Sequence, residues 1–283
     1  MATIPGIFTG RAPRGVRGTH LALAAWTAIV IVFLYLPIVV LVVYSFNANR
    51  MALVWDGFTF RWYRELFEEA RAHLADERRS SLIASLWNSV VIASATTGLS
   101  VLLGTGSAWL LHRYRIPFLR TVRAAAYVPM ILPEILLGIG LLVLFKTLSI
   151  ELGFLTIILA HTTFCFPFVM VTVQARLAGL DPSLEEAALD LGATPARAFR
   201  LVILPYLLPA IVAGGLLSFT LSFDELVVTY FTRGPTSETL PVKVYGMARV
   251  GLSPALNTIS TVLVVTTAMI VVVAEALKNA YKD

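Results

Sequence analysis

Apolar residues occur in six long runs separated by short polar connections. The runs cover residues 21–44, 82–111, 122–145, 152–173, 205–223 and 255–277. A helix needs about 20 apolar residues to cross a hydrocarbon core, and each run approaches or exceeds that length. Because the runs lack the alternation of a barrel strand, helices are the spanning elements. The pattern predicts an all-α membrane protein with six transmembrane helices, preceded by a tail at residues 1–20.

Composition supports this class, because 58% of the residues are apolar and only 14% are charged. Soluble domains have roughly 45–50% apolar and about 25% charged residues. The first run follows three arginines, as in a secretory signal, but it is too long and has no small-residue cleavage site. We therefore expect a retained span with its tail in the cytoplasm.

The net charge of +5 reflects membrane topology rather than nucleic-acid binding. With the N-terminus inside, twelve Lys and Arg residues fall on the cytoplasmic side and ten fall outside. The connection at residues 46–81 departs from the positive-inside rule, so the short loops carry more weight. Four arginines between the second and third spans favour this orientation: Arg113, Arg115, Arg120 and Arg123. Six spans then place the C-terminus in the cytoplasm as well.

Three local features refine the helices. Aromatic and charged residues alternate after residue 55, which predicts an interfacial amphipathic helix from near Thr59, with a disordered loop at residues 71–79 as the alternative. Small residues in the second span predict a place inside the bundle. Pro129 and Pro133 predict a kink or break in the third span. The single cysteine, Cys165, lies in the fourth span and is expected to be a packing residue.

The connection between spans four and five predicts two short helices, at about residues 182–200. Asp181 or Ser183 can cap the first helix, the latter through a capping box with Glu186. Gly192 ends this helix, and Thr194 followed by Pro195 starts the next. Four small or apolar residues share one face of the first helix, as in a helix that docks on another protein: Leu184, Ala187, Ala188 and Leu191.

The connection between spans five and six, at residues 224–254, is expected on the outer side. Gly234 and Pro235 predict a turn, and Ser237 is a candidate cap for a short helix that continues to Met247.

The segment EAALDLGATPARAFRLVILP resembles the cytoplasmic signature of ABC importer permeases. The matching positions are Glu186, Ala187, Ala188, Gly192, Val202, Leu204 and Pro205, with valine where the family has isoleucine. The resemblance implies the type I importer fold, with coupling helices that insert into a cytoplasmic ATPase. An ordinary solvated hairpin is the alternative. The chain contains no G-x-x-x-x-G-K-[ST] phosphate loop, so ATP and Mg are expected on a partner subunit and no cofactor or metal on this chain.

A wider resemblance, from about Trp62 to the last span, is to the spermidine/putrescine branch of that family. It implies a bacterial inner-membrane permease for a small cationic solute, with a homologous second permease, two ATP-binding subunits and an extracytoplasmic binding protein. Acidic residues are costly within spans and are therefore candidates for a substrate path. These candidates, with neighbouring aromatic residues suited to an alkylammonium ion, are Glu134, Phe223, Asp224, Glu225 and Tyr230. Interfacial anchoring or ion pairing is an equally good account of Asp224 and Glu225. For Glu134 a structural role is the better account, because an acid next to a proline can satisfy the broken backbone.

Three other functions are alternatives to this one. The same class of permease could carry an opine, an amino acid derivative or an aminophosphonate. A stand-alone secondary transporter is disfavoured by the docking signature. An intramembrane enzyme is disfavoured because the spans hold no Ser/His, paired Asp or H-E-x-x-H arrangement. His161 is the one histidine within a span, and we expect it to be a packing residue.

Overall fold

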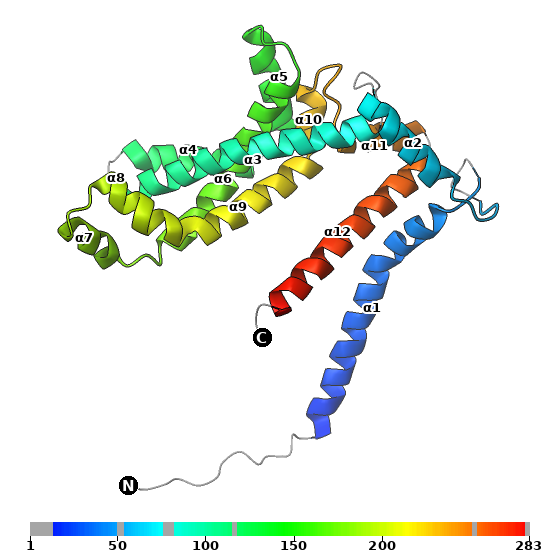
Figure 1. The fold of residues 1–283 in the computed structure, drawn as a ribbon, viewed down its shortest axis with the longest axis horizontal. Coiled ribbons are helices and arrows are strands. Elements are labelled where there is room, and N and C mark those ends of the chain that lie inside the picture. Colours follow the sequence, from blue (N-terminus) through cyan, green and yellow to red (C-terminus); the bar gives the residue numbers. More distant parts are fainter. Residues whose placement is uncertain (1–13, 50–53, 76–81, 115–117, 251–253, 281–283) are drawn as a thin grey trace. The chain divides into compact units, whose positions relative to one another are not determined.

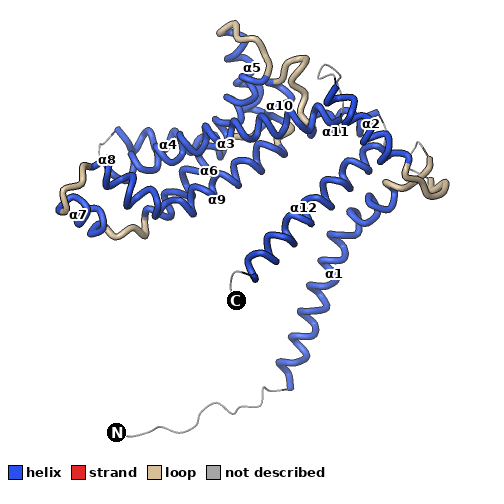
Figure 2. The backbone as a smooth tube through the Cα atoms, in the orientation of Figure 1, coloured by secondary structure: helices blue, strands red, loops and turns tan. Residues whose placement is uncertain are grey.

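The computed structural model describes residues 14–49, 54–75, 82–114, 118–250 and 254–280. Every regular element of these segments is a helix (Figures 1 and 2). The helices are α1 (Arg14–Tyr44), α2 (Arg61–Ala75), α3 (Leu82–Arg113), α4 (Phe118–Ile131), α5 (Glu134–Thr147), α6 (Phe154–Leu177), α7 (Pro182–Asp190), α8 (Pro195–Ala198), a π-helical turn (Phe199–Ile203), α9 (Leu204–Asp224), α10 (Val227–Thr232), α11 (Leu240–Val250) and α12 (Pro254–Ala280).

Among the described residues, helices meet the criteria for crossing a membrane at four of the six predicted spans, or at five if a broken pair counts as one. Four are long and apolar enough to cross a membrane: α1, α3, α6 and the continuous segment Pro195–Asp224. The α4–α5 pair satisfies the same criteria as one broken span, and α12 contributes a shorter apolar stretch, Pro254–Met269. Helix α1 begins at Arg14, so the predicted tail at residues 1–20 is helical in its last part, and residues 1–13 lie outside the described segments.

The predicted kink or break in the third span, residues 122–145, is confirmed, and the break lies at Pro133. Residues Thr121–Ile131 and Glu134–Thr147 meet at an angle of 110°. Pro129 is accommodated inside α4, whereas the chain breaks at Pro133, whose ψ of 131° is extended. Proline has no N–H and disfavours helical geometry in the preceding residue, so the helix ends there and restarts at Glu134.

The chain forms two compact units. The first contains residues 1–68 and 251–283, where α1 packs against α12. In this unit Asn47 organises the turn after α1: its side chain donates to Val54 O (2.7 Å), and its backbone oxygen accepts from the Trp62 indole (2.8 Å). The amphipathic helix begins at Arg61, close to the predicted start near Thr59, and the predicted loop at residues 71–79 is helical as far as Ala75. Residues 76–79 lie outside the described segments.

The second unit contains residues 69–250 and is built on α3, α6 and α9, which lie side by side (Figure 1). The predicted interior position of the second span is confirmed, since a face of α3 is buried against α6 and α9. Gly104 allows α3 and α6 to approach closely: a Cβ atom there would lie 2.7 Å from Val169 Cβ and 2.9 Å from Phe166 O. Cys165 is buried among these helices as a packing residue, and its thiol donates to Ser218 O (3.7 Å).

A substitution of Gly104 tests this packing. Gly104→Ala would force α3 away from the α6 backbone, and such overpacking costs about 1–3 kcal/mol. We expect a lower midpoint of thermal unfolding for the purified protein. Gly106→Ala is the control in the same helix, because a Cβ atom there meets no atom within 4 Å. Equal midpoints for the two variants would contradict the close α3–α6 contact.

Candidate functional site

The α7–α8 hairpin, residues 182–198, begins with a side-chain cap. Asp181 has extended backbone angles, and its Oδ1 accepts the Ser183 N–H at 2.9 Å, while Pro182 occupies the first helical position. The Asp181 cap is therefore confirmed. The alternative capping box of Ser183 with Glu186 is wrong, because Ser183 already lies inside the helix.

The same contacts act on the ionisation of Asp181. Hydrogen bonds from Ser183 lower the pKa of the Asp181 carboxyl group below its ordinary value, because they stabilise the ionised form. A carboxylate with a lowered pKa stabilises the fold at pH values above its unfolded pKa. This contribution is present at neutral pH and is lost as the pH falls through the lowered pKa.

Gly192 turns the chain between the two helices, as predicted. Its φ of +85° lies in the left-handed region that side chains other than glycine rarely adopt. The amides of Gly192 and Ala193 donate to the carbonyls of Leu189 (2.9 Å) and Ala188 (3.0 Å), which closes the end of α7. The predicted second start is also confirmed: Thr194 Oγ1 accepts from Arg197 N at 3.3 Å, ahead of α8.

The surface of α7 is left open within this chain. No residue of the helix is buried, and Glu186 is exposed. Three large apolar side chains are also exposed, namely Leu184 (46%), Leu189 (36%) and Leu191 (89%). The predicted face is thus uncovered at Leu184, Ala187 and Leu191, while Ala188 is half-buried. Such a face is typical of a helix that docks on a partner.

The hairpin is joined to the helical core at both ends. Glu185 forms an ion pair with Arg113, the last residue of α3. On the other side, the Phe199 ring lies 5.1 Å from the ring of Trp109, also on α3. The π-helical turn then places Ile203 in the buried cluster with Val173 and the other core residues of α3, α6 and α9. The hairpin is therefore attached to α3 and to the core that α3, α6 and α9 share.

The remaining signature residues connect the hairpin to α9. Val202 lies in the π-helical turn, and Leu204 and Pro205 are the first two residues of α9. After the turn at Gly192, the signature segment thus continues through α8 and the π-helical turn into α9, which belongs to the continuous spanning segment Pro195–Asp224.

Three of the five substrate-path candidates meet where two helices break. Glu134 is the first residue of α5, immediately after the break at Pro133, and Asp224 and Glu225 stand at the break between α9 and α10. The two breaks lie together because α5 packs on α10, and Glu225 is within electrostatic reach of both Glu134 and Asp224. We refer to Glu134, Asp224 and Glu225 as the acid triad.

The acids of the triad differ in accessibility. Glu225 is only 6% exposed, and its Oε1 accepts the Val228 N–H at 2.8 Å, so this carboxylate serves the start of α10. Glu134 and Asp224 are exposed. Phe223 is half-buried and stacks on Phe219, with 5.9 Å between the ring centroids.

Tyr230 lies elsewhere on α10. It lines a cavity of about 700 Å³ together with Lys146, Glu151 and Arg233, and the Arg233 guanidinium lies 5.8 Å from the centre of its ring. The ring therefore already faces a cation of the protein itself.

His161 is buried, as expected of a packing residue, and it also joins three helices. Its Nδ1 lies 2.7 Å from Ser222 Oγ on α9, and its Nε2 lies 2.8 Å from Thr229 Oγ1 on α10. The Thr229 hydroxyl donates its own hydrogen to Glu225 O, so it accepts from Nε2, and Nδ1 accepts from Ser222. Among the described residues, no group of His, Cys, Asp and Glu side chains could hold a metal ion.

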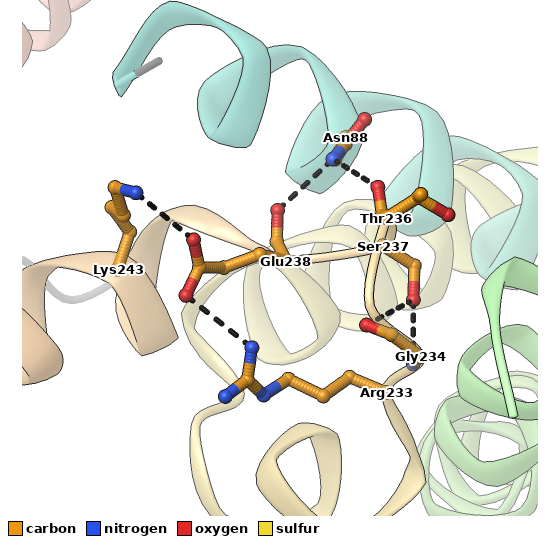
Figure 3. Close-up of polar contacts among 7 residues, drawn as sticks. All are labelled: Asn88, Arg233, Gly234, Thr236, Ser237, Glu238 and Lys243. Carbon is orange, nitrogen blue, oxygen red and sulfur yellow. Dashed lines mark hydrogen bonds and ion pairs between the residues drawn. The ribbon is translucent and has the colours of Figure 1, made fainter. Parts of the chain in front are cut away.

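The connection after α10 is fixed by polar contacts (Figure 3). The Glu238 carboxylate bridges Arg233 (3.3 Å) and Lys243 (3.1 Å), while the Asn88 side chain on α3 donates to the Glu238 backbone oxygen (3.0 Å) and to Thr236 O (3.5 Å). These contacts attach the connection to α3, and sequence spacing gave no signal for them.

The predicted turn at Gly234 and Pro235 is confirmed, but the cap assigned to Ser237 is wrong. Ser237 Oγ instead accepts from Gly234 N at 2.8 Å within the turn, and α11 begins at Leu240. The Leu240 N–H donates to Ser89 Oγ on α3 at 2.8 Å. The hydroxyl at this helix start thus comes from a distant helix.

Known proteins share both the sequence and the fold. Residues 100–281 match the family described as "Binding-protein-dependent transport system inner membrane component". The chain is 41% identical over 245 residues to the spermidine/putrescine transport system permease protein PotC of Escherichia coli (strain K12), covering 87% of this chain and 89% of that protein. It is 39% identical over 238 residues to the putrescine transport system permease protein PotI of the same strain, covering 82% and 81%.

Among solved structures, a bacterial ABC transporter involved in the import of alginate has a TM-score of 0.71 at 15% identity, covering 96% of this chain and 99% of that one. The MetNI methionine ABC transporter, in an inward-facing conformation, has a TM-score of 0.59 at 20% identity, covering 70% and 95%. The arrangement of helices is therefore that of the ABC importer permeases.

The turn at Gly192 offers a test of the hairpin. Gly192→Ala should weaken the hairpin by about 1–2 kcal/mol, because an alanine is strained at this positive φ. Hydrogen exchange of the α7 and α8 amides should become faster. Gly192→Asn is the matched control, since asparagine tolerates the left-handed region better. Unchanged exchange in the alanine variant would show that the turn does not hold the hairpin.

Proposed function

Since this chain belongs to the family of inner-membrane components of binding-protein-dependent transport systems, we propose that it is the permease subunit of an ATP-driven polyamine importer. It is a multi-pass transport subunit rather than an enzyme, and it has the type I importer permease fold. The proposed cargo is a small cation such as spermidine or putrescine. The observation that carries the proposal is the exposed, capped α7–α8 hairpin at the start of a helix that ends at the acid triad.

The hairpin is the proposed contact with the ATPase. Its caps at Asp181 and Thr194 and its turn at Gly192 make it stiff, while Glu186 and Leu191 are exposed for a partner. Glu186 supplies a charge that sets the register of docking, and Ala187 and Ala188 allow close approach. Binding and hydrolysis of ATP take place on the partner subunit, which also holds the Mg ion.

Helix α9 links this contact to the proposed substrate path. It begins at the end of the signature, Leu204 and Pro205, and ends at Asp224. A helix of this length spans about 30 Å at 1.5 Å per residue, which is the thickness of the hydrocarbon core. When closure of the ATPase displaces the hairpin, α9 transmits the displacement to the acid triad as one rigid element. Alternation between inward-open and outward-open states follows from this connection.

The acid triad is the proposed cation-binding part of the path. Glu134 and Asp224 are exposed and each lies within electrostatic reach of Glu225, so ammonium groups of a polyamine can pair with them. The buried Glu225 adds negative charge beside these two acids, while its Oε1 accepts from Val228 N at the start of α10. Since unpaired carboxylates are costly in a membrane, a cationic substrate gains free energy by neutralising them.

The complete importer is proposed to contain a homologous second permease, two ATP-binding subunits and an extracytoplasmic binding protein. In the proposed topology, both termini and the hairpin lie in the cytoplasm. The arginines near the hairpin support this orientation, because Arg113, Arg123 and Arg176 all lie at the ends of α3, α4 and α6 that adjoin it.

Reversal of the charge at Glu186 tests the docking role. Glu186→Lys should abolish uptake and uncouple ATP hydrolysis from transport, while the protein remains in the membrane. The measurements are radiolabelled spermidine uptake and ATPase activity in proteoliposomes that contain the whole importer and its binding protein. Glu186→Gln should give an intermediate loss, and Glu68→Lys on the exposed surface of α2 should transport normally. Wild-type transport by Glu186→Lys would refute the docking role.

Neutralisation of Asp224 tests the substrate path. Asp224→Asn should reduce uptake of putrescine and spermidine about tenfold, which corresponds to the loss of one charge-assisted contact. Assembly with the ATPase should be unchanged in a pull-down assay. Asp56→Asn, an exposed carboxylate in the connection after α1, is the control. Unchanged uptake kinetics in Asp224→Asn would remove this residue from the path.

A further inference from the structure

A small polar cavity lies beside the attachment of the α7–α8 hairpin. It has a volume of about 180 Å³ and is lined by His112 near the end of α3, Arg123 on α4, and Gln174, Leu177 and Ala178 at the end of α6. This volume equals that of about six water molecules at roughly 30 Å³ each. The cavity is thus large enough for a small polyatomic group, and the acid triad has no part in it.

The polar lining of this cavity includes several hydrogen-bond donors. Tyr127 donates to Gln174 Oε1 at 2.7 Å, which satisfies the amide oxygen and sets the orientation of the amide group. Gln174 Nε2 is buried and has no partner among the described residues. A buried donor without an acceptor is destabilising. A bound group that accepts a hydrogen bond from this amide would remove that cost, and none of the described residues does so.

Arg123 contributes positive charge to the same cavity. Its Nη2 donates to Leu111 O at 3.1 Å, which uses one of the five N–H donors of the guanidinium group. None of the residues that line the cavity is acidic. Histidine, arginine and a glutamine amide together offer donors on several sides of one small volume.

The arginine in the cavity lining opposes the negative ends of two helices. The C-termini of α3 and α6 each place about half a negative charge here. Against these stands the full positive charge of Arg123, which lines the cavity. Arg113 is neutralised by Glu185, and Arg176 is directed to Tyr206 on α9, whose backbone oxygen accepts from its Nε at 3.2 Å. Arg123 thus supplies one full positive charge directly to the cavity.

We propose that this cavity binds a phosphate-bearing anion, held by Arg123, His112 and Gln174. Phosphate oxygens accept several hydrogen bonds at once, and a guanidinium group matches their geometry. Basic pockets between transmembrane helices on the cytoplasmic side are suited to anionic lipid headgroups, and free phosphate offers the same oxygens. The site is independent of the proposed cargo.

Occupancy of this site acts on the hairpin. His112 immediately precedes Arg113, whose ion pair with Glu185 attaches α7 to α3. A phosphate group that joins α3, α4 and α6 at this point restrains the helix ends that receive the motion of the hairpin. The bound anion therefore strengthens the mechanical coupling between the hairpin and the membrane helices.

The test uses the purified, complete transporter in lipid nanodiscs. In one arm, inorganic phosphate is titrated into phosphatidylcholine discs, with sodium chloride at matched ionic strength as the reference. In the other arm, discs contain phosphatidylglycerol and no phosphate. The readouts are the midpoint of thermal unfolding and, by native mass spectrometry, the number of phosphatidylglycerol molecules retained.

We expect phosphate, phosphatidylglycerol or both to raise the unfolding midpoint of the wild-type transporter beyond the effect of chloride. Arg123→Gln should weaken the apparent affinity about tenfold or more, because it removes a charge-assisted contact. Arg64→Gln is the control. It replaces an exposed arginine on α2 that is distant in sequence from the residues of the cavity, and it should leave the affinity unchanged.

The two arms separate the sources of the anion. A response to inorganic phosphate alone identifies free phosphate, and retention of phosphatidylglycerol alone identifies a lipid headgroup; both support the site. No specific response of the wild type in either arm, or an equal response in Arg123→Gln, overturns the proposal. If Arg123→Gln does not assemble, His112→Gln takes its place, and an unchanged affinity in that variant also overturns it.

Discussion

A helix break inside the membrane has to replace hydrogen bonds that the membrane cannot supply. Hydrocarbon offers no partner to a free N–H or C=O group, and each unsatisfied group costs several kcal/mol. The protein meets this constraint with side chains at the helix starts. Glu225 accepts from Val228 N at the start of α10, Ser89 accepts from Leu240 N at α11, and Glu69 accepts from Leu82 N at α3.

The cap at Glu225 explains why the break before α10 can be functional without loosening the fold. Glu225 is near the break before α5 and holds the start of α10, and the Thr229 hydroxyl donates to its backbone oxygen. His161 then fixes Thr229 and Ser222, so α6, α9 and α10 are joined at one level. The exposed acids, Glu134 and Asp224, thus sit on a rigid frame, and their separation is set by the packing of whole helices.

The same rigidity serves the other end of α9. The close α3–α6 contact at Gly104 and the buried cluster around Ile203 leave little room for local adjustment. A force applied to the α7–α8 hairpin therefore moves helices as bodies, since well-packed interiors are not continuously deformable. In the function proposed here, a stiff hairpin, a spanning α9 and a capped break form one mechanical path from the ATPase to the substrate.

The sequence by itself determined the helical class, the positions of the spans, and the hairpin with its Asp181 cap, Gly192 turn and Thr194 start. These features depend on composition, on runs of apolar residues, and on backbone preferences of single residues, all of which are local. The prolines also predicted a break in the span at residues 122–145, and the tertiary structure set its angle of 110° at Pro133. Tertiary structure alone decided that Arg113 pairs with Glu185 and that Ser89 rather than Ser237 serves α11. Such partners are far apart in the chain, and no periodicity or spacing records which helices will meet.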